Sequence, residues 1–229
     1  MEKAYKHITW LFVAILLLVP IGFRRYFGLF PSVNQIARQV HFHTICMGVW
    51  CVLLVVQPLL IRWKQRKWHR LLGMFSYVLV PTIIYSILLV IAYSYERMTS
   101  HMSMVDNRAQ VFTPISQMIL FGFFYSLAMY HRKAVGLHMR YIIVSSIALL
   151  GPTIGRINFT SLGLQHVDMD LIIMEVVLII LLIVEGKNRK VYFPYIVGLV
   201  AYTLMHLGYY YFTHTIIWQH FIGMFFRGG

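Results

Sequence analysis

The sequence has few charged residues, and acidic residues are the rarest among them. Only 12% of its 229 residues are charged, against about 25% in a typical soluble domain, while 59% are hydrophobic. Seven Asp and Glu stand against twenty Lys and Arg, which gives a formal net charge of +13. A soluble chain of this size cannot bury so much apolar surface, so the composition excludes an ordinary soluble domain and predicts a membrane protein.

Several common functional signatures are also missing from the sequence. It contains neither an HExxH motif nor a P-loop, which leaves zinc-protease and nucleotide-hydrolysis functions without support. Its last long apolar segment contains no Lys that could form a retinal Schiff base. The two cysteines, Cys46 and Cys51, fall in one apolar segment and are interpreted as buried thiols. Repeats and low-complexity linkers are absent too, so we expect residues 1–229 to form a single domain.

Long hydrophobic runs, by contrast, are abundant. A helix needs about 20 apolar residues to cross a hydrocarbon core of ~30 Å. Seven segments qualify, namely residues 7–23, 40–61, 71–94, 109–130, 139–155, 170–184 and 192–213. We therefore predict an all-α fold: an integral membrane bundle of seven transmembrane helices, with the lipid bilayer rather than nucleic acid as its partner.

The basic residues predict the orientation of this bundle. The loop after the second segment contains Arg62, Lys64, Arg66, Lys67 and Arg70 and no acidic residue. Short loops of this kind stay on the cytoplasmic side of a membrane. We therefore expect the N-terminus in the cytoplasm and the C-terminus outside, and the basic residues before the fifth and seventh segments agree with this orientation.

With this orientation, ionisable side chains from several segments are expected to meet in the outer half of the membrane. Ionisable groups at membrane depth are costly, so they normally face the bundle interior and find partners there. Glu175 and His206 are the two that lie deepest from the outer ends of their segments. The layer comprises His41, His43, Gln117, Arg156, Asp168, Asp170, Glu175 and His206.

The first hypothesis for this layer is a metal-binding or redox site. Imidazole and carboxylate ligands suit zinc, iron, copper or manganese. The metal ligands would be His41, His43, Asp170 and His206. Because His41 and His43 are two residues apart, they point to different sides of a regular helix. Both can reach one ion only if the helix begins between them.

Two other hypotheses use the same residues differently. Glu175 is a candidate general base and Arg156 a candidate for orienting an anionic group, but whether the protein is an enzyme stays open. Alternatively, Arg156 pairs with Asp170, and His206 with Glu175, only to hold helices together in an accessory subunit of a larger membrane complex. In a third alternative, Glu175 and His206 form the proton relay of a small-molecule carrier.

A second pair of histidines is expected at the inner surface. His69 and His138 each begin a predicted span beside an arginine, so they lie at similar depth. Two such histidines on neighbouring helices could bind a b-type haem as axial ligands. Histidines among basic residues at a headgroup boundary also commonly contact lipid phosphate or cap a helix, so both interpretations stay open.

Several blocks of the sequence resemble a known protein family. They are His43 with Gly48, Gln57 and Arg62, WHRLLG at residues 68–73, SYVLVP at 76–81 and HMRYIIVSSIALLGPTIGR at 138–156. These blocks are similar to an uncharacterised family of bacterial predicted multi-pass membrane proteins, and they cover about half of the chain. The resemblance implies a bacterial inner-membrane protein, and it implies no particular activity.

Overall fold

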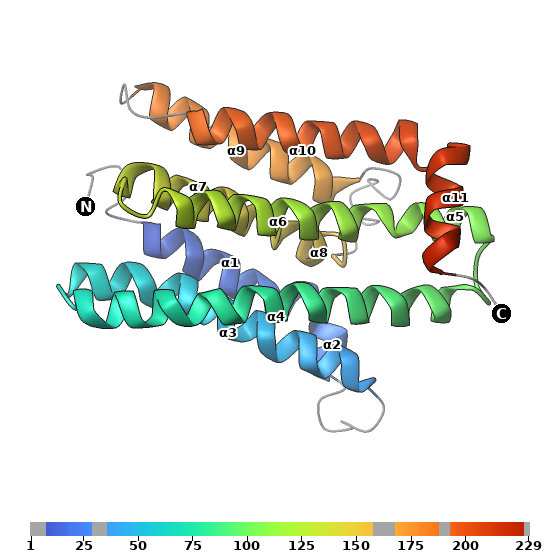
Figure 1. Cartoon of the computed structure of the whole chain (residues 1–229), viewed down its shortest axis with the longest axis horizontal. Helices are drawn as coiled ribbons and strands as arrows, with labels where there is room; N and C mark the ends of the chain where they lie inside the picture. The colour runs from blue at the N-terminus through green and yellow to red at the C-terminus, as the bar shows by residue number, and fades with distance from the viewer. Residues whose placement is uncertain (1–7, 29–35, 158–167, 188–192, 227–229) are drawn as a thin grey trace. The chain divides into compact units, whose positions relative to one another are not determined.

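The computed structural model describes residues 8–28, 36–157, 168–187 and 193–226 (Figure 1). All regular elements in these ranges are helices, which confirms the predicted all-α class. The helices are α1 (Ile8–Gly22), α2 (Arg24–Gly28), α3 (Arg38–Arg62), α4 (Arg66–Met98), α5 (Met104–Gln110), α6 (Phe112–Tyr130), α7 (Val135–Ile147), α8 (Leu150–Ile154), α9 (Met169–Lys187), α10 (Phe193–Phe212) and α11 (Ile216–Phe225).

Four stretches of the described chain are long and apolar enough to cross a membrane. They are α3, α4, the α5–α6 stretch Met104–Tyr130 and the α7–α8 stretch Val135–Ile154. The remaining predicted spans are helical as well. Of these, α1 is short, with 15 residues, and α9 contains three acidic residues, Asp170, Glu175 and Glu185. The structure thus supports a membrane protein with four candidate membrane-spanning helices.

Backbone contacts divide the chain into two units. Unit 1 comprises the described residues of Met1–Ile87 and Thr153–Gln165, and unit 2 those of Leu88–Pro152 and His166–Gly229. The helix α4 begins in unit 1 and ends in unit 2.

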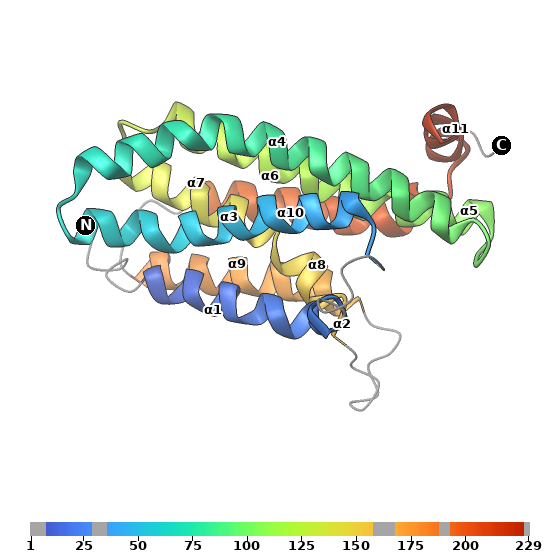
Figure 2. The ribbon, with the colours of Figure 1, turned by 90° about the horizontal axis from the view of Figure 1, so that it is seen from below.

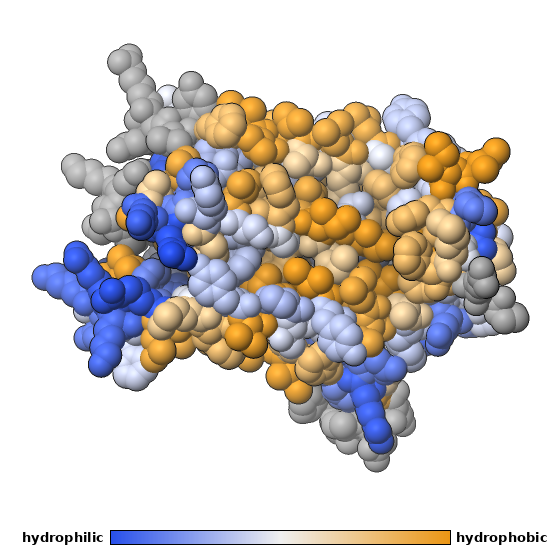
Figure 3. Space-filling view, in the orientation of Figure 1, coloured by the Kyte–Doolittle hydropathy of each residue, from blue (hydrophilic) through white to orange (hydrophobic). Residues whose placement is uncertain are grey.

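In unit 1, α1 packs against α3. At the end of α1, Gly22 lies so close to the backbone of Thr153 that a Cβ atom has no room there. The chain turns from α3 into α4 within three residues, and Lys64 in this turn has a φ of 60°. This turn carries the cluster of basic residues, which forms the hydrophilic surface at the left in Figure 3.

Prolines do not interrupt the long helices of the structure. Pro58 lies inside α3 and Pro81 inside α4, and both helices continue past them. Membrane helices tolerate internal proline because neighbouring groups satisfy the carbonyl that loses its partner. The two prolines are therefore consistent with the predicted spans.

In unit 2, α6 packs along α7, α9 packs along α10, and α10 also contacts α6 and α7 (Figures 1 and 2). The centre of this packing is aromatic. The ring of Phe124 stacks on Tyr141 and on Tyr202, each with 6.3 Å between ring centroids. Tyr202 also donates a hydrogen bond of 3.2 Å to the Val144 carbonyl, so its buried hydroxyl is satisfied.

A glycine allows α10 to approach its neighbours closely. A Cβ atom built on Gly198 would lie 2.8 Å from Cγ1 of Val144 on α7 and 3.2 Å from Cδ2 of Leu178 on α9. The first distance is shorter than any relaxed carbon–carbon contact. Gly198 therefore determines how closely α7, α9 and α10 pack.

Candidate functional site

A polar contact between two of the predicted site residues joins α9 to α10 in unit 2. Nδ1 of His206 lies 3.1 Å from Oε1 of Glu175. Both side chains are about one-fifth exposed, at 20% for His206 and 21% for Glu175. The pairing of His206 with Glu175 expected from the sequence is therefore confirmed. Because the carboxylate orients Nδ1, the imidazole presents Nε2 as its second reactive nitrogen.

This pair lines a pocket on the surface of unit 2. The pocket has a volume of about 490 Å³ and is lined by Glu175, Thr203, His206, Leu207, Tyr210 and Tyr211. Its volume lies within the range of small-molecule sites, which are mostly apolar with a few convergent polar groups. Leu207 and Tyr211 are strongly exposed, so the pocket opens along the side of α10 rather than into a closed cavity.

Further polar groups lie beside the pair, towards the N-terminal end of α9. The hydroxyl of Tyr210 donates a hydrogen bond to the carboxylate of Asp168, and the ring of Tyr210 lies 5.5 Å from that of His206. Asp170 is close enough to Asp168 and to His206 to interact electrostatically with both. Asp168, Tyr210 and Asp170 thus extend the polar region from the Glu175–His206 pair to the helix ends.

In unit 1, His43 contacts α4. Its Nδ1 lies 2.9 Å from the hydroxyl of Ser86, and this hydroxyl donates its proton to the carbonyl of Ile83 at 2.7 Å. Since the serine proton is already in use, the imidazole must donate, and the proton of neutral His43 is on Nδ1. Ser86 therefore selects one tautomer of His43 and leaves Nε2 as its acceptor.

His41 contacts a different element. Its Nδ1 lies 2.8 Å from the hydroxyl of Tyr26 on α2, and the two rings meet edge to face. Because α3 begins at Arg38, the helix is already regular at both histidines, so they point in different directions. The geometry that would bring His41 and His43 to one ion, a helix start between them, does not occur.

Arg156 also belongs to unit 1. Its guanidinium carbon lies 4.5 Å above the ring of Phe23, and its charge acts on His43. A cation over an aromatic face is stabilised by the ring quadrupole. Two members of the predicted layer, Arg156 and His43, are thus neighbours in unit 1. Asp170, Glu175 and His206 are neighbours in unit 2.

The two candidate haem ligands, His69 and His138, make local contacts. The side-chain amide of Gln57 on α3, oriented so that its nitrogen faces the imidazole, donates to Nδ1 of His69 and accepts from the backbone N–H of Gly73. Nδ1 of His138 bonds the carbonyl of Ala128 at 2.8 Å. Both contacts connect consecutive helices, α3 with α4 and α6 with α7.

The structure does not show a complete set of metal ligands in the part of the chain that it describes. Across the described ranges, no group of three or more His, Cys, Asp or Glu side chains is arranged so that it could hold a metal ion. The Glu175–His206 pair supplies two potential ligands and lacks a third of these types in that part of the chain.

One strong polar contact was missed in the sequence. Arg140 on α7 and Glu185 on α9 form a fully buried ion pair, with side chains 0% and 2% exposed. In the sequence, Arg140 looks like one of many basic residues expected on the cytoplasmic side, and Glu185 lies near the end of a predicted span. The available signal was their charge inside helical segments, since an ionised group at such a position needs an opposite charge.

Comparison of this chain with protein-family models, with curated proteins and with solved structures gives no match.

Proposed function

We propose that this protein is a proton-coupled small-molecule carrier, in which Glu175 and His206 form the proton-binding site. The observation that carries the proposal is the 3.1 Å contact between these two side chains in the wall of a 490 Å³ pocket. Ionisable residues in membrane segments that pair with one another are typical of proton relays and substrate pathways.

The His206–Glu175 pair can take up and release one proton. A proton that arrives at Nε2 of His206 produces an imidazolium, and the proton on Nδ1 can then pass to Oε1 of Glu175. The result is a neutral imidazole beside a neutral carboxylic acid, with one proton gained and no charge left on the carboxylate. Tyr210, hydrogen-bonded to Asp168 next to His206, provides polar groups between the pair and the helix end.

The membrane arrangement belongs to the same proposal. Each of the seven predicted spans coincides with a helix or a pair of consecutive helices in the described chain. We propose that all seven cross the inner membrane of a bacterium, with the N-terminus in the cytoplasm and the C-terminus outside. The basic residues of the α3–α4 turn favour this orientation.

Proton movement by the reconstituted protein tests the proposal. The full chain is placed in liposomes that contain a pH-sensitive dye, and a potassium gradient with valinomycin sets the membrane potential. We expect a potential-driven pH change that Glu175→Gln and His206→Ala both abolish. Glu96→Gln is the matched control, because it removes an exposed carboxylate outside the pocket and should leave the flux unchanged.

Two results would overturn the proposal. One is a wild-type flux no greater than that of empty liposomes at either sign of the potential. The other is a flux that Glu175→Gln reduces no more than Glu96→Gln does.

A metal site is the second candidate function, and one observation favours it. A metal-binding histidine usually donates its other ring nitrogen to a carboxylate, which is the relation between His206 and Glu175. Elemental analysis of the purified protein separates the two candidates. Bound metal that is lost in His206→Ala supports the metal site, whereas metal-free protein that conducts protons supports the carrier.

A further inference from the structure

The short helix α11 has an exposed side that is almost entirely apolar. Its exposed residues are Ile216, Ile217, His220, Phe221, Met224 and Phe225. They recur with the spacing of one helix face, and the exposed fractions reach 86% for Ile216, 70% for Ile217 and 69% for Phe225. Figure 3 shows these hydrophobic side chains at the surface over α11, at the right. In water, so much exposed apolar area on ten residues would be strongly unfavourable.

The opposite side of α11 is fixed to unit 2 by specific contacts. Trp218 is buried, and its Nε1 donates a hydrogen bond of 2.9 Å to the carbonyl of Arg108 on α5. The side chain of Gln219 donates to the carbonyls of Val105 and Thr213. At the end of α11, the ring of Phe226 packs on Tyr95 with 4.5 Å between centroids. These contacts prevent α11 from rotating, so its apolar side stays turned outward.

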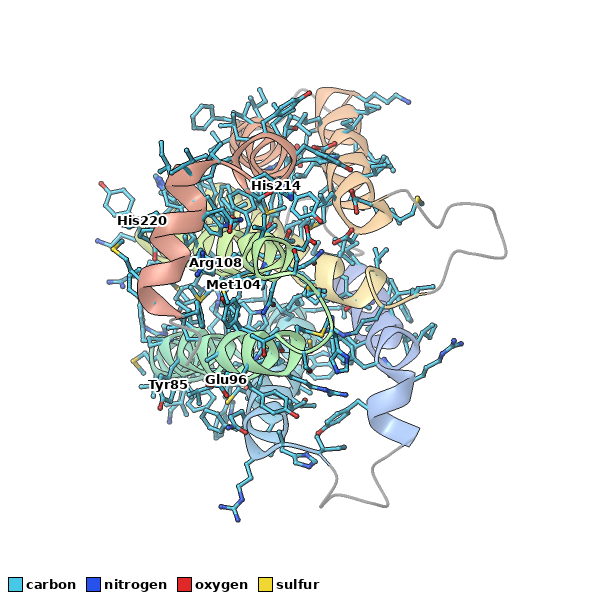
Figure 4. The ribbon with its side chains drawn as sticks, turned by 90° about the vertical axis from the view of Figure 1, so that its right-hand side faces the viewer. Tyr85, Glu96, Met104, Arg108, His214 and His220 are labelled. Atoms are coloured by element: carbon cyan, nitrogen blue, oxygen red, sulfur yellow. The ribbon has the colours of Figure 1, made fainter. Side chains whose placement is uncertain are left out.

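The direction of α11 differs from that of the long helices of unit 2. Figures 1 and 2 show α11 running across the end of α6 and α10 instead of along them. Figure 4 looks at this end of unit 2 and shows α11 crossing the view beside Arg108, with His220 on its outer side. A helix of ten residues is about 15 Å long, half of what a membrane span requires.

The position of α11 along the candidate span Met104–Tyr130 matches a membrane surface. Gln117 is the midpoint of this span, and Arg108, which contacts α11, lies about 13 Å from it along the helix axis. The hydrocarbon core ends about 15 Å from its centre. With the midpoint of this candidate span at the bilayer centre, α11 lies at the depth where acyl chains meet headgroups.

The composition of α11 fits this location. Its sequence IIWQHFIGMF has neither an acidic nor a basic residue other than His220. The apolar side continues at the neighbouring end of α10, where Tyr211 and Phe212 are exposed as well. A second copy of the chain or a partner protein could also cover such a face, but the depth and the crossing direction are those of a helix in the bilayer interface.

We infer that α11 is an interfacial helix whose exposed side, Ile217, Phe221 and Phe225 in particular, inserts between the lipids of one leaflet. The partner of this surface is the bilayer itself. Insertion would hold the end of α10, and with it the pocket of Glu175 and His206, at a fixed depth in the membrane. The inference is independent of what that pocket binds.

Spin-label accessibility in nanodiscs tests this inference. The full chain, with Cys46 and Cys51 replaced by alanine, receives a nitroxide at one position at a time: Ile217→Cys, Phe221→Cys or Phe225→Cys. Collision with oxygen, which concentrates in lipid, is compared with collision with a water-soluble nickel complex. We expect the oxygen-to-nickel ratio at all three positions to exceed several-fold that of Ser100→Cys, a matched control in the exposed turn between α4 and α5.

Two outcomes would overturn the inference. Labels on α11 that are as accessible to nickel as the Ser100→Cys label would place this face in water. Labels shielded from both reagents would mean that protein covers the face, either a second copy or another chain. If one label prevents folding, Ile216→Cys or Met224→Cys replaces it, because both positions are exposed on the same side.

Discussion

The guanidinium of Arg140 on α7 donates two parallel hydrogen bonds to the carboxylate of Glu185 on α9. Nε lies 3.1 Å from Oε1 and Nη2 lies 3.0 Å from Oε2. Arg140 also donates to the carbonyl of Gly136 at 2.9 Å. This bidentate geometry is the strongest form of a carboxylate–arginine contact. It links α7 to α9, and both charged side chains are buried.

Removing one partner of this ion pair should be far more harmful than removing both. Glu185→Gln leaves a buried guanidinium without a counter-charge, and we expect a loss of about 3–5 kcal/mol in the free energy of unfolding. The double variant Arg140→Met, Glu185→Leu buries no charge and should recover much of this loss. Thermal unfolding of the purified variants in detergent measures both effects. Equal stability of Glu185→Gln and wild type would contradict this account of the pair.

A methyl group at Gly198 should separate α10 from its neighbours. Gly198→Ala places a carbon 2.8 Å from Cγ1 of Val144, so the helices must shift apart, at a cost of about 1–3 kcal/mol in unfolding free energy. The matched control is Gly48→Ala on α3, where the new carbon meets no neighbouring group within 4 Å beyond the adjacent backbone of its own helix. The control should keep or increase stability, because alanine favours helix by ~1 kcal/mol over glycine. Similar melting temperatures for the two variants would show that α10 does not pack as closely as described.

The tautomer of His43 should depend on Ser86. With Ser86→Ala, the Nδ1 proton of His43 loses its acceptor, and we expect a destabilisation of about 1–2 kcal/mol together with a larger population of the Nε2–H tautomer. Nitrogen chemical shifts of ¹⁵N-labelled histidine report the tautomer. Thr82→Ala is the control, since this hydroxyl donates to the Val78 carbonyl within its own helix. An unchanged His43 spectrum in Ser86→Ala would refute the assignment.

The indole N–H of Trp218 should contribute to holding α11 in place. Trp218→Phe keeps an aromatic ring against Phe112, 5.1 Å away, but loses the hydrogen bond to the Arg108 carbonyl. We expect a loss of about 1 kcal/mol in stability and faster proteolysis after residue 213, while Trp218→Ala should release α11 altogether. Limited proteolysis with mass spectrometry measures the release. Identical digestion of all three proteins would mean that α11 is held by other contacts.

Much of the helical architecture follows from the sequence because length and hydropathy determine it. The segment 40–61 lies within α3, and 71–94 lies within α4. Hydropathy indicates where the apolar part of a helix ends, but it does not indicate where the helix itself ends. The prediction therefore missed the polar ends of α4, which extends from Arg66 to Met98. The predicted segments leave a loop from residue 62 to residue 70, whereas the structure has only a three-residue turn at Lys64, between Arg62 and Arg66.

The candidate site was predictable where it depends on depth alone. Counting helical rise from the segment ends places Glu175 and His206 at matching depth, and the structure pairs them. The helical rise gives the depth of a residue, but it does not give the rotation of the helix about its own axis. Sequence therefore gives no reason to pair His43 with Ser86, or Arg156 with Phe23, because both contacts depend on which faces the neighbouring helices present.

The length of α4 restricts how this helix can move in a membrane. Its 33 residues extend about 50 Å, whereas the hydrocarbon core is ~30 Å thick and spans tilt by at most about 40°. Even at that tilt both ends project beyond the acyl chains, with Arg66, Lys67 and Arg70 at one end and Glu96 and Arg97 at the other. Sliding in either direction along the membrane normal would drag charged groups into hydrocarbon. We therefore expect α4 to keep its position along the membrane normal. Under the proposed carrier function, the helices that move would then be others than α4.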